Sequence, residues 1–150
     1  MFESTSSLAH IIQLAVAPVF LLAGIAGFLS VISSRLGRII DRSRVVDRRL
    51  VALKDKEKIA SSCKELNVLS VRINWINRSI ALCVTSALMV CVVIVCLFSA
   101  VALELEISAL IKLFFVLSIL LLIAALICFL REVYLGSYTL KIAKEFILDD

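Results

Sequence analysis

Side chains that could perform chemistry are few in this chain of 150 residues, which contains one histidine and five cysteines. The histidine, His10, has no nucleophile motif near it, and the chain contains neither a glycine-rich phosphate loop nor an HExxH sequence. The cysteines show no CxxC spacing and have no neighbouring histidine, so we interpret them as small packing residues. We therefore expect no catalytic residue, no metal site and no cofactor, and predict that the protein is not an enzyme.

Two sets of residues have a spacing that could serve transport or binding instead. The first set is small or polar and lies in one apolar stretch; it could line a pathway through a membrane if several copies assembled. The second set is basic and follows directly; it could form the mouth of that pathway or contact anionic lipid headgroups. The simpler interpretation of the first set is a helix that packs against its neighbours. The two sets are Gln13, Pro18, Gly24, Gly27, Ser30 and Ser34, and Arg35, Arg38 and Arg42.

The chain contains three stretches without any Asp, Glu, Lys or Arg, at positions 4–34, 79–103 and 113–130, and the first set lies within the first of them. A hydrocarbon core of about 30 Å requires roughly 20 apolar residues in a helix that rises about 1.5 Å per residue. Hydrophobic residues make up 62% of the chain, which agrees with such an environment. We predict an all-α integral membrane protein with a single domain over residues 1–150. Its spans are expected at about 10–34, 80–103 and 108–130.

The basic residues are concentrated between the first two predicted spans, where twelve Lys and Arg stand against five Asp and Glu. The opposite side carries Glu3, Glu104, Glu106 and Lys112, a net charge of −2. Because basic loops face the cytoplasm, residues 35–79 and the tail are predicted inside and the N-terminus outside. This topology separates His10 from every aspartate and excludes a Ser-His-Asp triad within one subunit. No Lys or Arg precedes the first apolar stretch, which argues against a cleaved signal peptide.

The segment between the first two spans has apolar residues spaced alternately by three and four positions, as in a coiled coil. We predict a cytoplasmic antiparallel coiled-coil hairpin over residues 35–79, whose two helices continue the spans without a break. Its turn is expected near residues 55–62, where Ser62 could cap the returning helix. The predicted seam pairs Ile39 with Ile76, Val46 with Leu69, and Leu50 with Leu66.

A basic row and an uncharged polar row lie beside this seam. The simpler interpretation is that both rows are solvated helix faces; alternatively, one or both contact a neighbouring subunit, a ligand or lipid. No aromatic residues are interleaved with the basic row, so we do not expect nucleic-acid binding. The rows are Arg35, Arg38, Arg42 and Arg49 on the first helix, and Asn67, Ser70, Asn74 and Asn77 on the second.

The segment after the third span predicts a further helix, an amphipathic cytoplasmic tail over residues 131–150. Its apolar face would pack on the hairpin or lie on the inner leaflet. Gly136 weakens the predicted start of this helix. The face comprises Leu135, Tyr138, Ile142 and Phe146.

Several short motifs resemble those of one family of bacterial membrane proteins. The sequence Ile12-Gln13-Leu14-Ala15, followed by Ala17-Pro18-Val19-Phe20-Leu21-Leu22 and Gly24, resembles the first span of the group called domain of unknown function 2721. Later stretches support the resemblance, in order along the chain: Arg35-Leu36, Arg38-Ile39 with Asp41-Arg42 and Arg44, Ile76-Asn77-Arg78, and Phe129-Leu130-Arg131-Glu132-Val133. The resemblance implies a bacterial inner-membrane protein with three spans, and it implies no activity.

Two functional hypotheses from different classes follow. In the first, copies of the chain form a homo-oligomer in which the first span lines an ion channel with a basic inner mouth. In the second, the protein is a membrane scaffold or adaptor whose basic hairpin binds anionic lipid headgroups or an unidentified cytoplasmic protein. The hairpin alone is compatible with either hypothesis.

The charge asymmetry generates a test of topology. In a chain whose own cysteines are replaced by alanine, Lys56→Cys is expected to resist impermeant thiol reagents in intact cells and to react once the cells are opened, because the hairpin turn is inside. Labelling of Lys56→Cys from the periplasmic side of intact cells would show that the predicted orientation is inverted.

Overall fold

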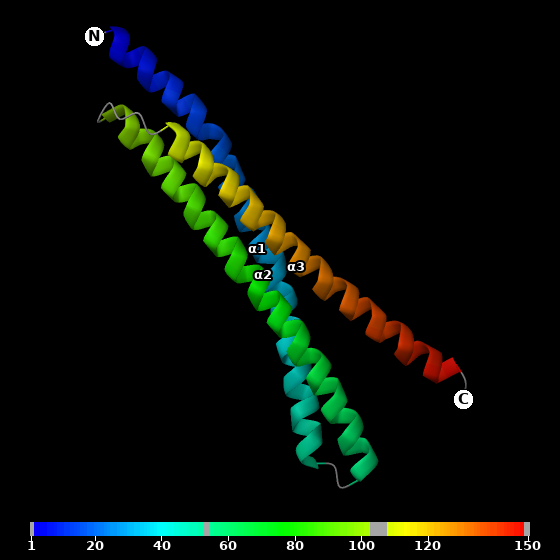
Figure 1. Cartoon of the computed structure of the whole chain (residues 1–150). Helices are drawn as coiled ribbons and strands as arrows, with labels where there is room; N and C mark the ends of the chain where they lie inside the picture. The colour runs from blue at the N-terminus through cyan, green and yellow to red at the C-terminus, as the bar shows by residue number, and fades with distance from the viewer. Residues whose placement is uncertain (1, 53–54, 103–107, 149–150) are drawn as a thin grey trace. The chain divides into compact units, whose positions relative to one another are not determined.

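The structure, a computed structural model of the chain, consists of three long α-helices and shows no strand among the residues it describes (Figure 1). They are α1 (Phe2–Ala52), α2 (Lys56–Ala102) and α3 (Ser108–Leu148). The backbone is described for residues 2–52, 55–102 and 108–148, and side-chain surroundings for residues 12–51, 55–100 and 108–136. Each helix contains a segment long and apolar enough to cross a membrane, within Ile12–Val51, Lys56–Ala100 and Ser108–Gly136. The predicted all-α class with three membrane-spanning helices is confirmed at this level.

Each predicted span continues into the segment beside it within one helix. Residues 35–52 prolong the first span in α1, and residues 56–79 precede the second span in α2. The predicted tail is likewise part of α3, which passes through Gly136 to Leu148. A single glycine inside a helix costs only about 1 kcal/mol, so neither Gly37 nor Gly136 ends its helix. The side chains after residue 136, and with them the predicted apolar face of the tail, lie outside the described residues.

The turn between α1 and α2 comes earlier than the sequence analysis predicted. α2 begins at Lys56, and Asp55 caps it: the Asp55 carboxylate accepts a hydrogen bond from the Glu57 amide at 3.2 Å, and its carbonyl accepts one from the Ile59 amide at 3.0 Å. Aspartate satisfies free amides at a helix start as well as serine does, so the helix begins at the first available cap. The predictions of a turn extending to residue 62 and of a cap at Ser62 were therefore wrong.

The helices contribute to two compact units, which are described separately. The first unit comprises Met1–Ser30 and Ala81–Ala124. Its buried apolar residues include Ile25, Val90 and Val93. Two buried serines also lie in it: the Ser86 hydroxyl donates a hydrogen bond to the Ser118 carbonyl at 2.7 Å and so joins α2 to α3.

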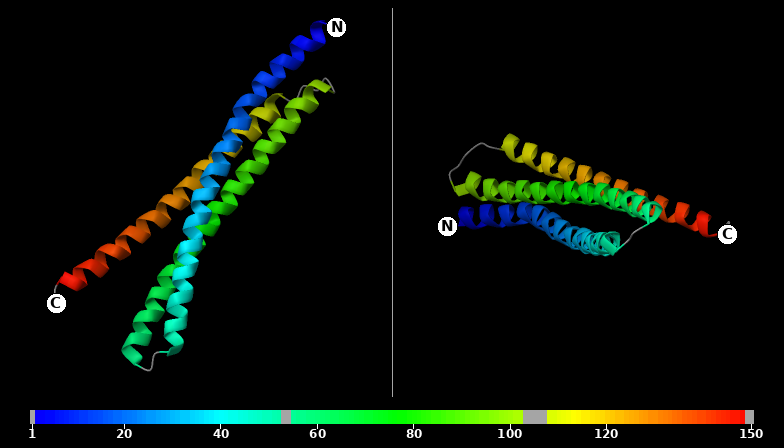
Figure 2. Two further views of the ribbon diagram at one scale, coloured as in Figure 1. Left: turned by 180° about the vertical axis from the view of Figure 1, so that it is seen from behind. Right: turned by 90° about the horizontal axis from the view of Figure 1, so that it is seen from below.

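The second unit comprises Val31–Ile80 and Ala125–Asp150. Here the last turns of α1 and the first turns of α2 lie side by side in every view (Figures 1 and 2). An ion pair between Arg42 and Glu65, with 2.7 Å between Nη2 and Oε1, links the two helices. Both side chains are about half exposed, and exposed pairs of this kind contribute only about 0–1 kcal/mol. Apolar burial must therefore supply most of the stability of this helix pair.

Burial in the second unit repeats every seven residues. On the first two helices of this unit, the buried apolar residues among those described are Ile32, Ile39 and Val46 on α1, and Leu69 and Ile76 on α2. This is the period of the predicted seam, and four of its six paired residues are buried as expected. The coiled coil itself stays a prediction.

The last predicted pair of the seam departs from this pattern. Leu50 and Leu66 are half-buried, and their pairing stays a prediction. They lie close to the turn between α1 and α2, and a pair of helices leaves the sides of its seam open where no third element covers it.

The buried seam predicts which substitutions destabilise the second unit. Val46→Asp or Leu69→Asp is expected to cost several kcal/mol in the free energy of unfolding, because each places a charge in an apolar contact. Lys56→Glu, an exposed change at the start of α2, should cost almost nothing. Thermal unfolding of the purified protein in detergent would measure the differences, and equal loss from all three changes would contradict the burial described above.

Candidate functional site

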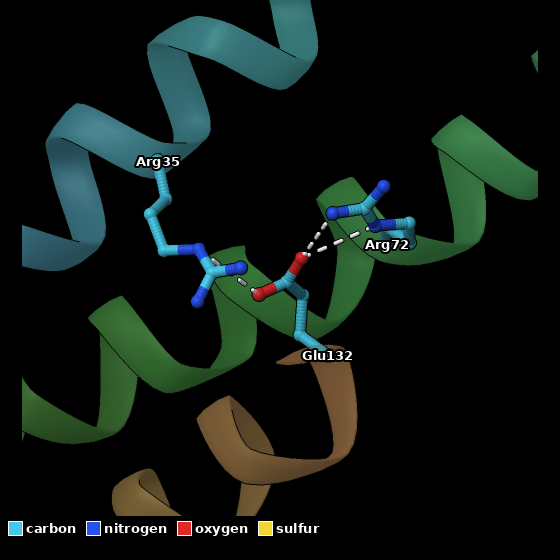
Figure 3. A network of polar contacts seen from close by, with 3 residues as sticks. All are labelled: Arg35, Arg72 and Glu132. Atoms are coloured by element: carbon cyan, nitrogen blue, oxygen red, sulfur yellow. Dashed lines mark hydrogen bonds and ion pairs between the residues drawn. The ribbon is translucent and has the colours of Figure 1, made fainter. Parts of the chain in front are cut away.

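The most unusual side chain in the second unit is Glu132, a carboxylate on α3 that is fully buried. It follows the charge-free stretch 113–130 after a single arginine. Burying an isolated carboxylate costs far more than a protein's whole stability, so such a group requires charged partners. Figure 3 shows them: Arg72 from α2 and Arg35 from α1 approach the carboxylate from different helices. Three helices therefore meet at one buried charge.

Arg72 makes the closer of the two contacts. Its Nε and Nη2 atoms donate hydrogen bonds to Glu132 Oε1 at 3.1 and 2.8 Å (Figure 3). The guanidinium lies over the backbone of Gly136, one turn further along α3. A Cβ atom at this glycine would come within 2.7 Å of Arg72 Nη2 and 3.1 Å of its Cζ. The absence of a side chain at Gly136 thus makes room for the arginine that neutralises Glu132.

Arg35 makes the looser contact. Its Nε lies 3.8 Å from Glu132 Oε2, which is an ion pair but too long for a hydrogen bond. Within the described part of the chain, Oε2 has no hydrogen-bond partner. The Arg35 guanidinium also lies 5.5 Å from the centre of the Phe129 ring, at a distance where a cation and an aromatic face attract.

The contact between α2 and α3 is repeated one heptad away from this cluster. The Ser79 hydroxyl donates a hydrogen bond to the Ala125 carbonyl at 2.8 Å, and both residues are buried. Ser79 lies seven residues after Arg72, and Ala125 lies seven residues before Glu132. A step of seven along α2 is thus matched by a step of seven back along α3, as expected for antiparallel helices in contact.

Trp75, the only tryptophan of the chain, is close to two further arginines in this unit. The Arg78 and Arg131 guanidinium carbons lie 5.5 and 5.6 Å from its ring centre. Arg78 is on the same helix as the tryptophan, whereas Arg131 comes from α3. Tryptophan rings favour the membrane–water interface, and arginine side chains near helix ends extend their charged groups to it. Arg131 and Glu132, neighbours in sequence, thus each contact a residue of α2.

An open groove of about 490 Å³ lies beside the buried carboxylate, lined by Val31, Arg35, Arg38, Ile39 and Arg72. Arg38 is exposed and has no hydrogen bond or ion pair to any residue in the described segments. The groove therefore presents three guanidinium groups, and one of them has no anionic partner. This arrangement can bind an anion; it offers no nucleophile or general base. A second groove, of about 230 Å³ in the first unit, is lined by apolar side chains alone.

The predicted site residues are distributed unevenly over these features. Pro18 is buried, whereas the other five residues of the predicted lining set are exposed within the single chain. Arg35 and Arg38 line the groove, and Arg42 is paired with Glu65 outside it. The side chains of His10 and Glu3, and residues Glu104 and Glu106, lie outside the described part.

Sequence reasoning missed Glu132, Arg72 and the purpose of Gly136. The sequence patterns include Glu132 only within a family motif, and Arg72 only as one of the twelve basic residues between the first two spans. A signal was present: Glu132 and Gly136 are four residues apart, so one helix face carries an acid beside a bare backbone at the end of an apolar stretch. What the sequence could not show was that Arg72 approaches that face.

The described helices and their composition define a class, a helical multi-pass membrane protein. The chain belongs to the family described as Protein of unknown function (DUF2721), which matches residues 15–142. This match confirms the resemblance found in the sequence motifs. No curated protein and no solved structure matches the chain.

The buried carboxylate predicts a strongly coupled pair. Arg72→Met is expected to cost about 3–5 kcal/mol in the free energy of unfolding, because it leaves Glu132 buried with one distant partner. Adding Glu132→Met should recover most of that loss, since the charge that needs neutralising is then gone. Arg42→Met is the matched control and should cost less than about 1 kcal/mol, because its pair with Glu65 is exposed. Thermal unfolding in detergent measures the wild type, these three variants and Glu132→Met alone, and simple additivity of Arg72→Met and Glu132→Met would contradict the coupling.

Proposed function

We propose that the protein is a non-enzymatic, homo-oligomeric protein of the bacterial inner membrane in which α1 helices of several copies surround an ion pathway. In this proposal the N-terminus is outside, and the hairpin of residues 35–79 and the tail are in the cytoplasm. The basic composition of the hairpin and the negative charge of the opposite side support this orientation.

The observation that carries the proposal is the exposed face of α1 in the first unit. Gln13, Gly24, Gly27 and Ser30 are all exposed there, and a Cβ atom added at either glycine would meet nothing within 4 Å. In a single copy, this face would present a polar amide and bare backbone to lipid. Small residues allow helices to approach closely in membranes, and a partner helix would satisfy the amide that lipid cannot. Association of copies through α1 removes this mismatch.

The ion pathway is supported by the polar residues on the exposed positions of α1. Serine hydroxyls and a glutamine amide offer an ion both donors and acceptors. Ser34 and Arg38, also exposed, continue the polar character in the second unit, and the charge of Arg38 favours anions. Pro18 is buried and has no part in the lining that we propose.

The second candidate function is a membrane scaffold or adaptor whose basic hairpin binds a protein partner or anionic lipid. Its support is the exposure of arginines that have no partner within the described residues: Arg38, Arg48 and Arg49 on α1. Basic residues close to a membrane surface are attracted by anionic lipid, by about 1 kcal/mol each.

Disulfide crosslinking in native membranes tests the assembly. In a cysteine-free chain, Gly27→Cys is expected to give a covalent dimer on mild oxidation, because this position lies on the proposed interface. Leu120→Cys on α3 is the matched control, since Leu120 is 56% exposed and belongs to the same unit. Crosslinking of both positions to the same extent would contradict an interface formed by α1.

Ion flux into liposomes tests the pathway. The reconstituted protein should conduct above empty liposomes and favour anions, and Arg38→Gln should weaken that preference while Arg48→Gln leaves it unchanged. If Gly27→Cys forms crosslinked dimers but the protein shows no conductance, the proposed ion pathway is contradicted and the proposed homo-oligomer is retained.

A further inference from the structure

We propose that the groove lined by Arg35, Arg38 and Arg72 binds the phosphate monoester headgroup of an anionic lipid, as in phosphatidic acid. This inference rests on the lipid-binding form of the second candidate function and does not depend on the ion pathway. It assigns functional roles to three further residues, Arg72, Glu132 and Gly136.

The charge of the site fits a doubly charged anion. Three guanidinium groups line the groove, and Glu132, the acid in contact with two of them, offsets one positive charge. The net charge of these four side chains is +2. A phosphate monoester carries about −1.5 to −2 at pH 7, whereas the phosphodiester of most anionic lipids carries a single charge. The monoester therefore complements the groove more completely.

The arginines are arranged to donate to an anion. Arg72 uses Nε and Nη2 on Glu132, which leaves its other terminal nitrogen without a partner in the described residues. Arg35 is held by Glu132 Oε2 and the Phe129 ring, and its contact to the carboxylate uses only Nε. A guanidinium fork fixed in this way recognises phosphate through charge-assisted hydrogen bonds with little further loss of side-chain freedom. Glu132 acts here as a positioning residue.

We expect the groove near the level of the lipid phosphates, because its arginines lie close to the ends of the charge-free stretches. Arg35 is the first charged residue after the charge-free stretch 4–34, and Glu132 is the second after the stretch 113–130. Arg72 lies seven residues before Ser79, the start of the charge-free stretch 79–103, which corresponds to about 10 Å along a helix. Headgroup regions extend about 5–8 Å beyond each side of the hydrocarbon core, so the Arg72 side chain must extend back towards the membrane to reach a phosphate. Val31 and Ile39 give the groove apolar walls beside its charges, as an amphipathic headgroup requires.

Binding of defined lipids to the full-length protein in detergent, measured by native mass spectrometry, tests the inference. Dihexanoyl phosphatidic acid is expected to bind about tenfold more tightly than dihexanoyl phosphatidylglycerol, a difference of about 1.4 kcal/mol. Phosphatidylcholine with the same chains serves as the neutral reference. Inorganic phosphate should compete only weakly, because it lacks the glycerol and acyl groups that contact the apolar walls.

Three variants locate the binding. Arg38→Gln should lower the affinity for phosphatidic acid about tenfold without changing the fold, because Arg38 has no partner in the described part of the chain. Arg48→Gln, the matched control on the same helix, should leave the affinity unchanged. Gly136→Ala should also weaken binding, because its Cβ displaces Arg72, and helical content measured by circular dichroism checks that the variant still folds.

The outcomes separate this inference from the function on which it rests. Equal affinity for phosphatidic acid and phosphatidylglycerol, both above phosphatidylcholine, would overturn the monoester site and keep the lipid-binding scaffold. Equal affinity for all three lipids would overturn both. Equal loss from Arg38→Gln and Arg48→Gln would show diffuse attraction in place of a groove, and inorganic phosphate that competes as well as phosphatidic acid would make a soluble anion the ligand.

Discussion

A carboxylate that water does not reach must be neutralised by its protein neighbours, and this requirement organises the second unit around Glu132. Arg72 supplies most of the neutralising charge, through hydrogen bonds of 2.8 and 3.1 Å to one carboxylate oxygen. Arg35 contributes further positive charge at 3.8 Å from the other oxygen. Because the three side chains come from three helices, the charge balance is satisfied only when all three helices are in place. The bare backbone at Gly136 belongs to the same constraint, since a Cβ atom there would lie 2.7 Å from Arg72 Nη2 and the guanidinium would have to shift.

Polar contacts have a larger part in a membrane than their number suggests. Helices surrounded by lipid gain little from apolar burial, because lipid tails are as apolar as leucine. Most of the large apolar residues on α3 are exposed or half-buried within the chain, so their packing alone defines no single arrangement. Hydrogen bonds from serine hydroxyls to carbonyls of the facing helix, and the ion pairs at Glu132, can select one register among many apolar alternatives.

The sequence predicted the features that depend on local pattern. Charge-free stretches predicted the three helices, and spacing by three and four predicted that Ile39, Val46, Leu69 and Ile76 are buried. The site depends on a different kind of information, the meeting of residues that are 60 positions apart, such as Arg72 and Glu132. No periodicity reports such a contact. The error at the turn had a local cause, because Asp55 and Ser62 are both acceptable caps and the sequence alone does not decide between them.

The matched spacing of contacts between α2 and α3 limits how this chain can change length during evolution. In the second unit, an inserted residue between Arg72 and Ser79 would rotate one of them by about 100° away from α3, so one of the two contacts would be lost. An insertion of seven residues in each helix, by contrast, adds about two full turns to both and keeps both contacts facing each other. Single residues are therefore expected to be gained or lost at the turns, whereas the two helices are expected to change length only by seven residues each. The helices of homologous proteins would then differ in length by steps of about 10 Å.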